Sequence, residues 1–318
     1  MLEPALCLPE SPRTTLKSGA MKIAITGASG FIGRRLMKLL AGRGHRLHVL
    51  SRHAGTNLPV GVGLTVWDPL GPAPEAPLRD VDAVLHLAGE PVAQRWTAAA
   101  KQRIHDSRVA GTRHLVAALA NCSPRPAVLV CASAIGYYGS RGDEVLNEDS
   151  GPGTGFLADV CVAWEREAAK AEDLGMRVTR IRIGVVLDPR GGALKPMLRP
   201  FRWGLGGPLG GGRQWMSWIH ASDLAEMFRF ALENPAPPVL NGVAPGAVTN
   251  AEFTRTLAGA LHRPAFLPVP KFALRLLFGE MSDMLLASQC VAPVAAEAAG
   301  FQFQHGQLAE ALGDLLRG

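Results

Sequence analysis

Short apolar runs rich in β-branched residues alternate, up to residue 187, with longer segments in which apolar residues recur every three or four positions. The runs do not alternate with polar residues, so they predict strands buried on both faces, and the longer segments predict helices. The predicted strands are 22–26, 46–50, 64–67, 83–88, 127–133 and 177–187, and the clearest helices are 31–40, 99–119 and 157–171. The pattern predicts an α/β fold with a doubly wound parallel sheet.

The pattern changes after residue 187. Residues 204–212 (GLGGPLGGG) contain six glycines, which a regular helix does not tolerate, so we expect either a mobile loop or a surface of close backbone approach. A helix at 223–232 and a short strand at 239–240 are predicted next. Thr249 and Glu252 have the spacing of a capping box, which predicts another helix start, and two or three further helices complete the chain.

Three glycines lie between the first predicted strand and the first predicted helix, in the stretch ITGASGFIGRRL. Gly27 would permit a tight turn, Gly30 a close approach of the backbone to a pyrophosphate, and Gly33 the packing of helix on strand. The helix N-terminus would then face the phosphates. The predicted phosphate turn consists of Gly27, Ser29, Gly30, Phe31, Ile32 and Gly33. The alternative is an ordinary strand-to-helix turn without a ligand.

The residues after the second predicted strand favour NADP over NAD. Sites for NAD place an acidic side chain about twenty residues past the glycines, yet no Asp or Glu lies between Gly33 and Trp67. Arg52 ends the second strand instead, and a guanidinium can hold a 2′-phosphate through two parallel hydrogen bonds. We therefore predict NADP as the cofactor, with Arg52 at its 2′-phosphate. The alternative is that Arg52 is a solvated residue at a strand end.

Several longer motifs point to a known family. TGASGFIG, LHLAGEP and SAIGYYG together resemble the extended short-chain dehydrogenase/reductase superfamily. AGEPVAQRWTAAAKQRIHDSRVAGTRHL, PFRWGLGGPLGGGRQWMSWIHASDL and NGVAPGAVTNAEF resemble its atypical branch called epimerase family proteins, sometimes labelled cell-division-inhibitor-like. The resemblance covers 21–316 and implies an NADP-binding Rossmann fold with a small C-terminal domain of unassigned role at 267–316.

The resemblance also implies roles for individual residues. Asp68 would lie beside the adenine after the third strand, and Ser133 corresponds to the active-site serine. The backbone wall along the cofactor would be formed by Leu87, Ala88 and Gly89.

One catalytic feature of the superfamily is missing. Members that transfer hydride use a tyrosine followed four residues later by a lysine, because a nearby ammonium lowers the pKa of the phenol from about 10 toward neutrality. The corresponding helix here lies within 155–170. It carries Phe156 and Leu157 near the tyrosine position and Val160 and Cys161 near the lysine position. None of these side chains can exchange a proton as the pair does.

The chain has two tyrosines, Tyr137 and Tyr138, and three hypotheses remain. In the first, Ser133 orients the substrate oxygen while Tyr138, or with less support Tyr137, exchanges the proton. In the second, the protein binds NADP without turnover. In the third, hydride transfer dominates and water supplies the proton. Groups considered as helpers in the first hypothesis are Arg141, Glu165 and His220. Simpler interpretations are half-buried aromatics for the tyrosines, a strand-end cap for Ser133, a solvated carboxylate for Glu165 and a backbone-bonded histidine for His220.

The segment after the sixth strand carries positive charge. No Asp or Glu occurs from Pro189 through Ser222, whereas this stretch contains Arg190, Lys195, Arg199, Arg202 and Arg213. Such cations beside a glycine-rich loop would suit an anionic ligand, for example a nucleotide-sugar diphosphate or a carboxylate. A lid over the nicotinamide or a solvated basic helix followed by a linker are the alternatives.

We therefore predict a flexible extension at 1–20, an NADP-binding Rossmann domain at 21–187 plus 220–248, and a substrate-side subdomain at 188–219 plus 249–318. The expected activity is hydride transfer at a carbinol carbon of a small-molecule substrate, as an oxidoreductase or as a sugar-nucleotide epimerase acting through a transient ketone. The alternative from another class is a non-catalytic NADP(H)-binding sensor or regulatory protein.

Composition limits the kinds of partner, metal site and cellular location that we expect. The 33 Lys and Arg residues exceed the 27 Asp and Glu residues by 6, but no basic run of five or six exists, so we do not expect nucleic-acid binding. Five cysteines without a CxxC pair predict reduced thiols and a cytoplasmic protein, and no Cys or His cluster predicts a metal site. No apolar run reaches the ~20 residues of a membrane span. Homo-oligomerisation is left open.

Overall fold

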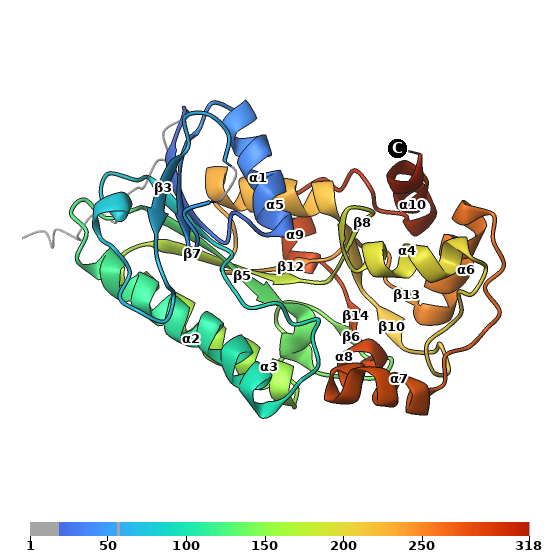
Figure 1. Cartoon of the computed structure of the whole chain (residues 1–318). Helices are drawn as coiled ribbons and strands as arrows, with labels where there is room; N and C mark the ends of the chain where they lie inside the picture. The colour runs from blue at the N-terminus through green and yellow to red at the C-terminus, as the bar shows by residue number, and fades with distance from the viewer. Residues whose placement is uncertain (1–18, 56–57, 318) are drawn as a thin grey trace, which may run out of the picture.

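A central parallel sheet organises the computed structural model, which describes residues 19–55 and 58–317. Its strand order is β12-β7-β5-β4-β1-β2-β3 (Figure 1). The strands are β1 Lys22–Thr26, β2 Arg46–Ser51, β3 Gly63–Val66, β4 Ala83–His86, β5 Val128–Ala134, β7 Arg177–Ile183 and β12 Val239–Gly242. Chain order reverses between β1 and β4, the place where this topology binds nucleotides. The predicted doubly wound Rossmann fold is confirmed. Almost all of the predicted 1–20 extension lies outside the described residues.

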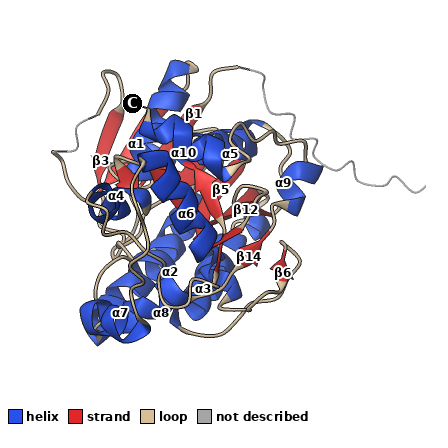
Figure 2. Cartoon of the chain, turned by 90° about the vertical axis from the view of Figure 1, so that its right-hand side faces the viewer, coloured by secondary structure: helices blue, strands red, loops and turns tan. Residues whose placement is uncertain are grey.

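Helices cover both faces of the sheet (Figure 2). On one face lie α1 (Phe31–Gly42) and α5 (Ala221–Glu233), which pack against each other, and on the other lie α2 (Ala98–Ala120) and α3 (Phe156–Ala169). All four residues of β4 are buried, as a strand covered on both sides requires. One core cluster fills the space between the sheet and α1 and α5, and another lies between the sheet and α2.

The single strand predicted at 177–187 is two strands in the structure, so that prediction is wrong. β7 stays in the central sheet, whereas β8 (Val185–Asp188) joins a second sheet with β9 (Gly191–Gly192) and β11 (Trp218–His220). Gly184 separates them, and a Cβ atom there would lie 2.5 Å from the carbonyl oxygen of Ser217. Continuous apolar sequence hides this break because Gly184 acts through a contact with a distant segment.

A third hydrophobic core lies beside the sheet and contains residues from both segments of the predicted substrate-side subdomain. It is built mainly by α4 (Leu194–Arg202), α6 (Asn250–Leu261) and α10 (Leu308–Leu316). However, α9 (Val294–Ala298) packs against β12, so part of the C-terminal segment belongs to the edge of the central sheet. The boundary between the two predicted domains stays a prediction.

The remaining elements are short. They are β6 Val145–Leu146, β10 Trp215–Met216, β13 Val248–Thr249, β14 Cys290–Val291, α7 Lys271–Phe278 and α8 Ser282–Leu286, with 3-10 turns at Ala76–Leu78, Ile135–Tyr138, Glu172–Leu174 and Gly279–Met281. Figure 2 shows α7 and α8 near α2. Lys101 of α2 forms an ion pair with Glu280, which lies in the turn that connects α7 to α8. No helix in 19–55 or 58–317 is long and apolar enough to cross a membrane.

The glycine-rich stretch 204–212 is a surface of close backbone approach, one of the two expected alternatives. A Cβ atom at Gly207 would collide with the carbonyl group of Leu267. The amide of Gly210 donates to the carbonyl oxygen of Val269 at 2.8 Å. Glycine is therefore required here by packing against the segment before α7.

Candidate nucleotide-binding and active site

The turn from β1 into α1 leaves no room for side chains at two of its glycines. Gly27 has a φ of +71°, and a Cβ atom there would lie 2.6 Å from the carbonyl carbon of Leu87. A Cβ atom at Gly33 would lie 2.6 Å from the Cα of Ala28. Gly27 therefore lets the end of β1 approach the segment after β4, and Gly33 lets α1 pack on the turn.

The start of α1 is suited to an anion. Its N-cap residue, Gly30, has no side chain to accept from the free N–H groups of the first turn, and no acidic residue lies in that turn. Ser29 and Gly30 are exposed. Phe31 is half-buried against the β8–β9 turn, where a Cβ atom at Gly191 would collide with its ring. Uncapped N–H groups and the helix dipole fit the pyrophosphate of a dinucleotide.

A buried histidine joins the elements at the switch point. The Thr26 hydroxyl lies 2.7 Å from His86 Nδ1, and His86 Nε2 lies 2.9 Å from the Thr112 hydroxyl. The Thr26 oxygen also accepts from the amides of Leu87 and Ala88, each at 3.2 Å. Burial lowers the pKa of His86 to about 4, so the ring is neutral. Sequence reasoning missed this network, whose only signal is a histidine inside the apolar run of β4.

Arg52 lies just past β2 with its side chain 55% exposed. Its guanidinium is 3.7 Å from a carboxylate oxygen of Glu90, and the other oxygen of that carboxylate is 3.7 Å from Arg103. Asp68 is exposed and accepts from the amide of Leu70 at 3.1 Å. The roles of Arg52 and Asp68 toward a cofactor stay predictions, and Glu90 is a neighbour of Arg52 that the sequence did not indicate.

Arg108 of α2 brings a cation to the wall formed by Leu87–Gly89. It donates to the carbonyl oxygen of Glu90 at 3.0 Å, and a Cβ atom at Gly89 would lie 3.0 Å from its guanidinium carbon. The guanidinium stacks 5.2 Å from the ring of Trp164 on α3. It also interacts electrostatically with Cys161, although burial raises the pKa of that thiol to about 12. Arg108 thus brings positive charge to the face of α3 that carries Trp164.

The predicted catalytic residues Ser133 and Tyr138 belong to a buried polar network. The Ser133 hydroxyl donates to Glu165 at 2.6 Å, and Arg182 donates twice to the same carboxylate, both at 2.9 Å. Arg182 also donates to the Tyr138 hydroxyl at 2.9 Å, which in turn donates to Asn241 at 2.7 Å. All five side chains are buried. The network ties β5, α3, β7 and β12 together beneath the predicted active site.

This placement argues against Tyr138 as the proton donor. Its ring is fully buried and its hydroxyl has both a donor and an acceptor. Burial raises its pKa to about 12, so the phenol gives up its proton less readily than an ordinary tyrosine. Tyr137 is only half-buried, with the Arg182 guanidinium 3.5 Å from its ring centre. The sequence could not show which of two adjacent tyrosines faces the core.

The three helper residues considered from the sequence are also accounted for. Glu165 is buried in the Arg182 pair rather than solvated. Arg141 pairs with Glu144 at 2.7 Å on the surface. His220 accepts from the amide of Ser222 at the start of α5, as the simpler interpretation expected, and it also lies in a separate cluster with His305. Glu165 thus belongs to the network of Tyr138, with Arg182 between the two side chains.

Comparison with protein families agrees with this geometry. Residues 23–242 match the NAD dependent epimerase/dehydratase family, a span that includes the glycine turn, the Leu87–Gly89 wall and the central sheet. The chain belongs to this family. Residues 269–315 match a C-terminal domain of unknown function, which confirms the predicted resemblance at 267–316.

Members of the family from distant organisms share most of the chain. An epimerase family protein of Mycobacterium bovis is 44% identical over 92% of this chain and 96% of its own length. Epimerase family protein SDR39U1 of Homo sapiens is 37% identical over 93% of this chain and 100% of its own. A relative from Arabidopsis thaliana, 41% identical, is named chloroplastic, so the predicted cytoplasmic location of this chain stays a prediction.

Solved structures of family members have the same fold. Human SDR39U1 with NADPH superposes with a TM-score of 0.86 at 37% identity, covering 94% of this chain and 100% of that one. A nucleoside-diphosphate sugar epimerase from Corynebacterium glutamicum gives 0.76 at 35% identity, covering 93% of this chain and 58% of that one. MoeE5 with UDP-glucose and NAD, at 22% identity and a TM-score of 0.75, shows the fold alone. A nicotinamide dinucleotide site is therefore part of this family fold.

Proposed function

We propose that this protein binds NADP(H) at the β1–β4 switch point and transfers hydride to or from a carbinol carbon of an anionic small molecule. The observation that carries the proposal is the β1–α1 turn. Gly27 brings β1 against Leu87 without space for a side chain, and the start of α1 presents N–H groups without a side-chain cap. When bound, the nicotinamide supplies the hydride donor or acceptor.

The choice of NADP over NAD rests on charge. Arg52 projects from the end of β2 with more than half of its side chain exposed, and its ion pair with Glu90, at 3.7 Å, is loose. Because an exposed pair of this kind contributes about 0–1 kcal/mol, a phosphate can displace the Glu90 carboxylate. The human relative solved with NADPH supports the same choice.

Arg108 provides the positive charge that the lysine provides in the short-chain dehydrogenase/reductase superfamily. Its guanidinium lies between the cofactor wall at Gly89 and the ring of Trp164 on α3. A fixed cation there would stabilise negative charge that develops on a substrate oxygen during hydride transfer. No buried tyrosine is needed for this step, and solvent supplies the proton.

An anionic substrate is supported by exposed cations on and after α4, beside the β8–β9 turn that packs on Phe31. Lys195, Arg199 and Arg202 are exposed, and Arg199 stacks 4.8 Å from the ring of Trp203. Arg190 differs, because Asp188 accepts from both its backbone amide and its side chain. The α4 cations together with Trp203 offer charge and a flat apolar surface to a phosphorylated or carboxylated ligand.

The test is loss of the near-ultraviolet absorbance of NADPH with a panel of aldehydes, ketones and sugar nucleotides, combined with NMR of the products. The proposal expects at least one anionic carbonyl compound or sugar nucleotide to be converted. Arg108→Ala should lower kcat by about 100-fold with little change in NADPH affinity, and Arg108→Lys should restore part of the rate. Conversion by Arg108→Ala at the wild-type rate would remove Arg108 from the mechanism.

A second candidate function is an NADP(H)-binding sensor without turnover. The observation that favours it is the buried network around Tyr138 and Ser133, in which the predicted proton-exchanging hydroxyl and the predicted substrate-orienting hydroxyl are both hydrogen bonded inside the core. Tight NADPH binding with no conversion across the whole panel would support the sensor and contradict the hydride-transfer proposal.

A further inference from the structure

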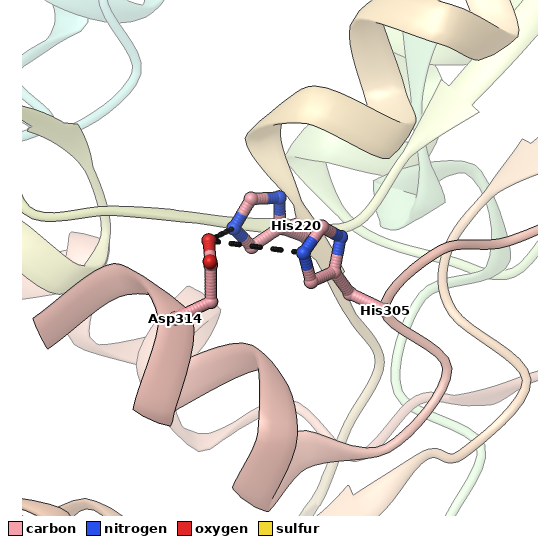
Figure 3. Close-up of side chains that lie close together, drawn as sticks. All are labelled: His220, His305 and Asp314. Atoms are coloured by element: carbon pink, nitrogen blue, oxygen red, sulfur yellow. Dashed lines mark ion pairs between the residues drawn. The ribbon is translucent and has the colours of Figure 1, made fainter. Parts of the chain in front are cut away.

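Three side chains that are far apart in the sequence meet at one point beside the second sheet. His220 lies where β11 passes into α5, His305 lies in the segment before α10, and Asp314 lies on α10. Figure 3 shows both imidazole rings turned toward the Asp314 carboxylate. The cluster is separate from the β1–α1 turn and from the Ser133 network.

The distances between the potential ligand atoms suit one small metal ion. His220 Nε2 lies 3.4 Å from Asp314 Oδ2, and His305 Nε2 lies 3.7 Å from the same oxygen (Figure 3). All three ligand atoms lie within 4.8 Å of one another. Tetrahedral Zn²⁺ with bonds of about 2.0–2.1 Å has ligand atoms about 3.3 Å apart. Two of the three edges are therefore close to the required length.

The other nitrogen of each ring has a partner that orients it. His220 Nδ1 is hydrogen bonded to the Ser222 hydroxyl, and His305 Nδ1 lies 3.4 Å from a carboxylate oxygen of Asp223. Asp223 is buried and also accepts from the amides of Gln304 and His305. Metal-binding histidines almost always have such an outer partner, most often a carboxylate or carbonyl. This arrangement leaves both Nε2 atoms aimed at Asp314.

His220 places a potential ligand atom, Nε2, in a buried position where it makes no hydrogen bond to the described residues. Its side chain is 4% exposed. Asp314 is 57% exposed, which gives an ion access from solvent.

The charges around the cluster are balanced for a divalent ion. Asp314 and Asp223 together carry two negative charges that face the histidines. One cation that acts on His220 is Arg35, and Asp188 holds Arg35 at 2.5 Å. A divalent ion would therefore meet a site of matching charge.

We propose that His220, His305 and Asp314 form a binding site for Zn²⁺, with water as the fourth ligand. The two rings are now stacked, with centres 3.8 Å apart and planes 19° apart, so the more exposed His305 ring turns on binding to point its Nε2 lone pair at the ion. The ring proton of His220 moves from Nε2 to Nδ1, which then donates a hydrogen bond to Ser222 Oγ. The hydrogen bond that Nδ1 now accepts from the Ser222 amide is lost. The ion ties α10 to the start of α5.

The test is calorimetric titration of the full-length chain with ZnCl₂ after treatment with a chelator, together with thermal unfolding. We expect one saturable equivalent and a rise in the unfolding temperature that Mg²⁺ does not produce. Asp314→Asn and His305→Asn should each weaken Zn²⁺ binding by at least about 10- to 100-fold. His105→Ala is the matched control, because His105 also lies beside a carboxylate, that of Asp106 at 2.9 Å, and it should leave binding unchanged.

Co²⁺ provides a second measurement that does not depend on stability. The proposal expects visible absorption bands of a tetrahedral Co²⁺ complex in the wild type and His105→Ala, and their loss in Asp314→Asn. Zn²⁺ binding that is unchanged in both Asp314→Asn and His305→Asn would mean adventitious binding to other surface groups. That result, or the absence of any saturable binding, would overturn the proposal.

Discussion

Replacing Tyr138 by phenylalanine tests whether the buried polar network is structural. The Tyr138 hydroxyl accepts from Arg182 at 2.9 Å and donates to Asn241 at 2.7 Å, and the ring is fully buried. Tyr138→Phe keeps the ring and removes both bonds, which leaves Arg182 with one donor and Asn241 with one acceptor unsatisfied. Leaving such groups unsatisfied costs about 1–3 kcal/mol.

The same network predicts a larger effect for Glu165→Gln. The Glu165 carboxylate accepts one hydrogen bond from Ser133 and two from Arg182, and both members of the ion pair are buried. The substitution leaves the Arg182 charge unpaired in the core, which costs about 3–5 kcal/mol. Because a domain is stable by only about 5–15 kcal/mol, we expect Glu165→Gln to be strongly destabilised and Tyr138→Phe to be moderately so.

Urea unfolding followed by circular dichroism measures these losses, with NADPH affinity measured on the same samples. Tyr137→Phe is the matched control, because the Tyr137 hydroxyl makes no hydrogen bond within 19–55 and 58–317; it should change stability by less than about 0.5 kcal/mol. Tyr138→Phe should bind NADPH within about twofold of wild type. Unchanged stability together with lost turnover in Tyr138→Phe would refute the structural role and restore Tyr138 as the proton donor.

Three further predictions concern the nucleotide site. Arg52→Ala should weaken NADPH binding by about 10- to 100-fold, the effect of losing hydrogen bonds to a charged group, and should weaken NADH binding by less than twofold. Arg79→Ala is the control, because Arg79 is 58% exposed beside Glu75. Equal losses of affinity for both cofactors would contradict the assignment of Arg52 to the 2′-phosphate. At Gly27, φ is +71° and an added Cβ atom would lie 2.6 Å from Leu87. Gly27→Ala should therefore lower the free energy of unfolding by more than about 2 kcal/mol and abolish NADPH binding, as measured by equilibrium unfolding and calorimetry. Burial lowers the pKa of His86 from its ordinary value of 6.5 to about 4 in the folded chain, so the unfolded chain takes up this proton first as pH falls. Stability present above about pH 6.5 should therefore drop by about 2 kcal/mol near pH 5. Urea unfolding of His86→Gln should lack this part of the decrease.

Local signals in the sequence were sufficient to predict the fold of the nucleotide-binding half. Strands such as β4 and β5 are mostly apolar because both faces are covered, and the Gly27 turn is required by a backbone contact that only glycine allows. The family resemblance extended this to the C-terminal domain. The apolar runs and the spacing of the glycines are visible along the chain and reveal these features, even though Gly27 makes its contact with the distant Leu87.

The rest depends on contacts between distant segments. Glu165 looked solvated because its helix face was not known, yet Arg182 arrives from β7 and buries it. Nothing in the sequence places His305 beside His220, so no metal site was predicted from spacing. The pairing of Glu90 with Arg52 likewise requires the ends of β2 and β4, which flank β1, to lie at the same edge of the sheet.

The measurement that tests the central claim most directly is calorimetric titration of the wild-type chain with NADPH and, separately, with NADH under identical conditions. The arrangement of Arg52 and the uncapped start of α1 predicts one bound NADPH per chain, at least about tenfold tighter than NADH. No heat with NADPH, or NADH binding as tightly as NADPH, would contradict it.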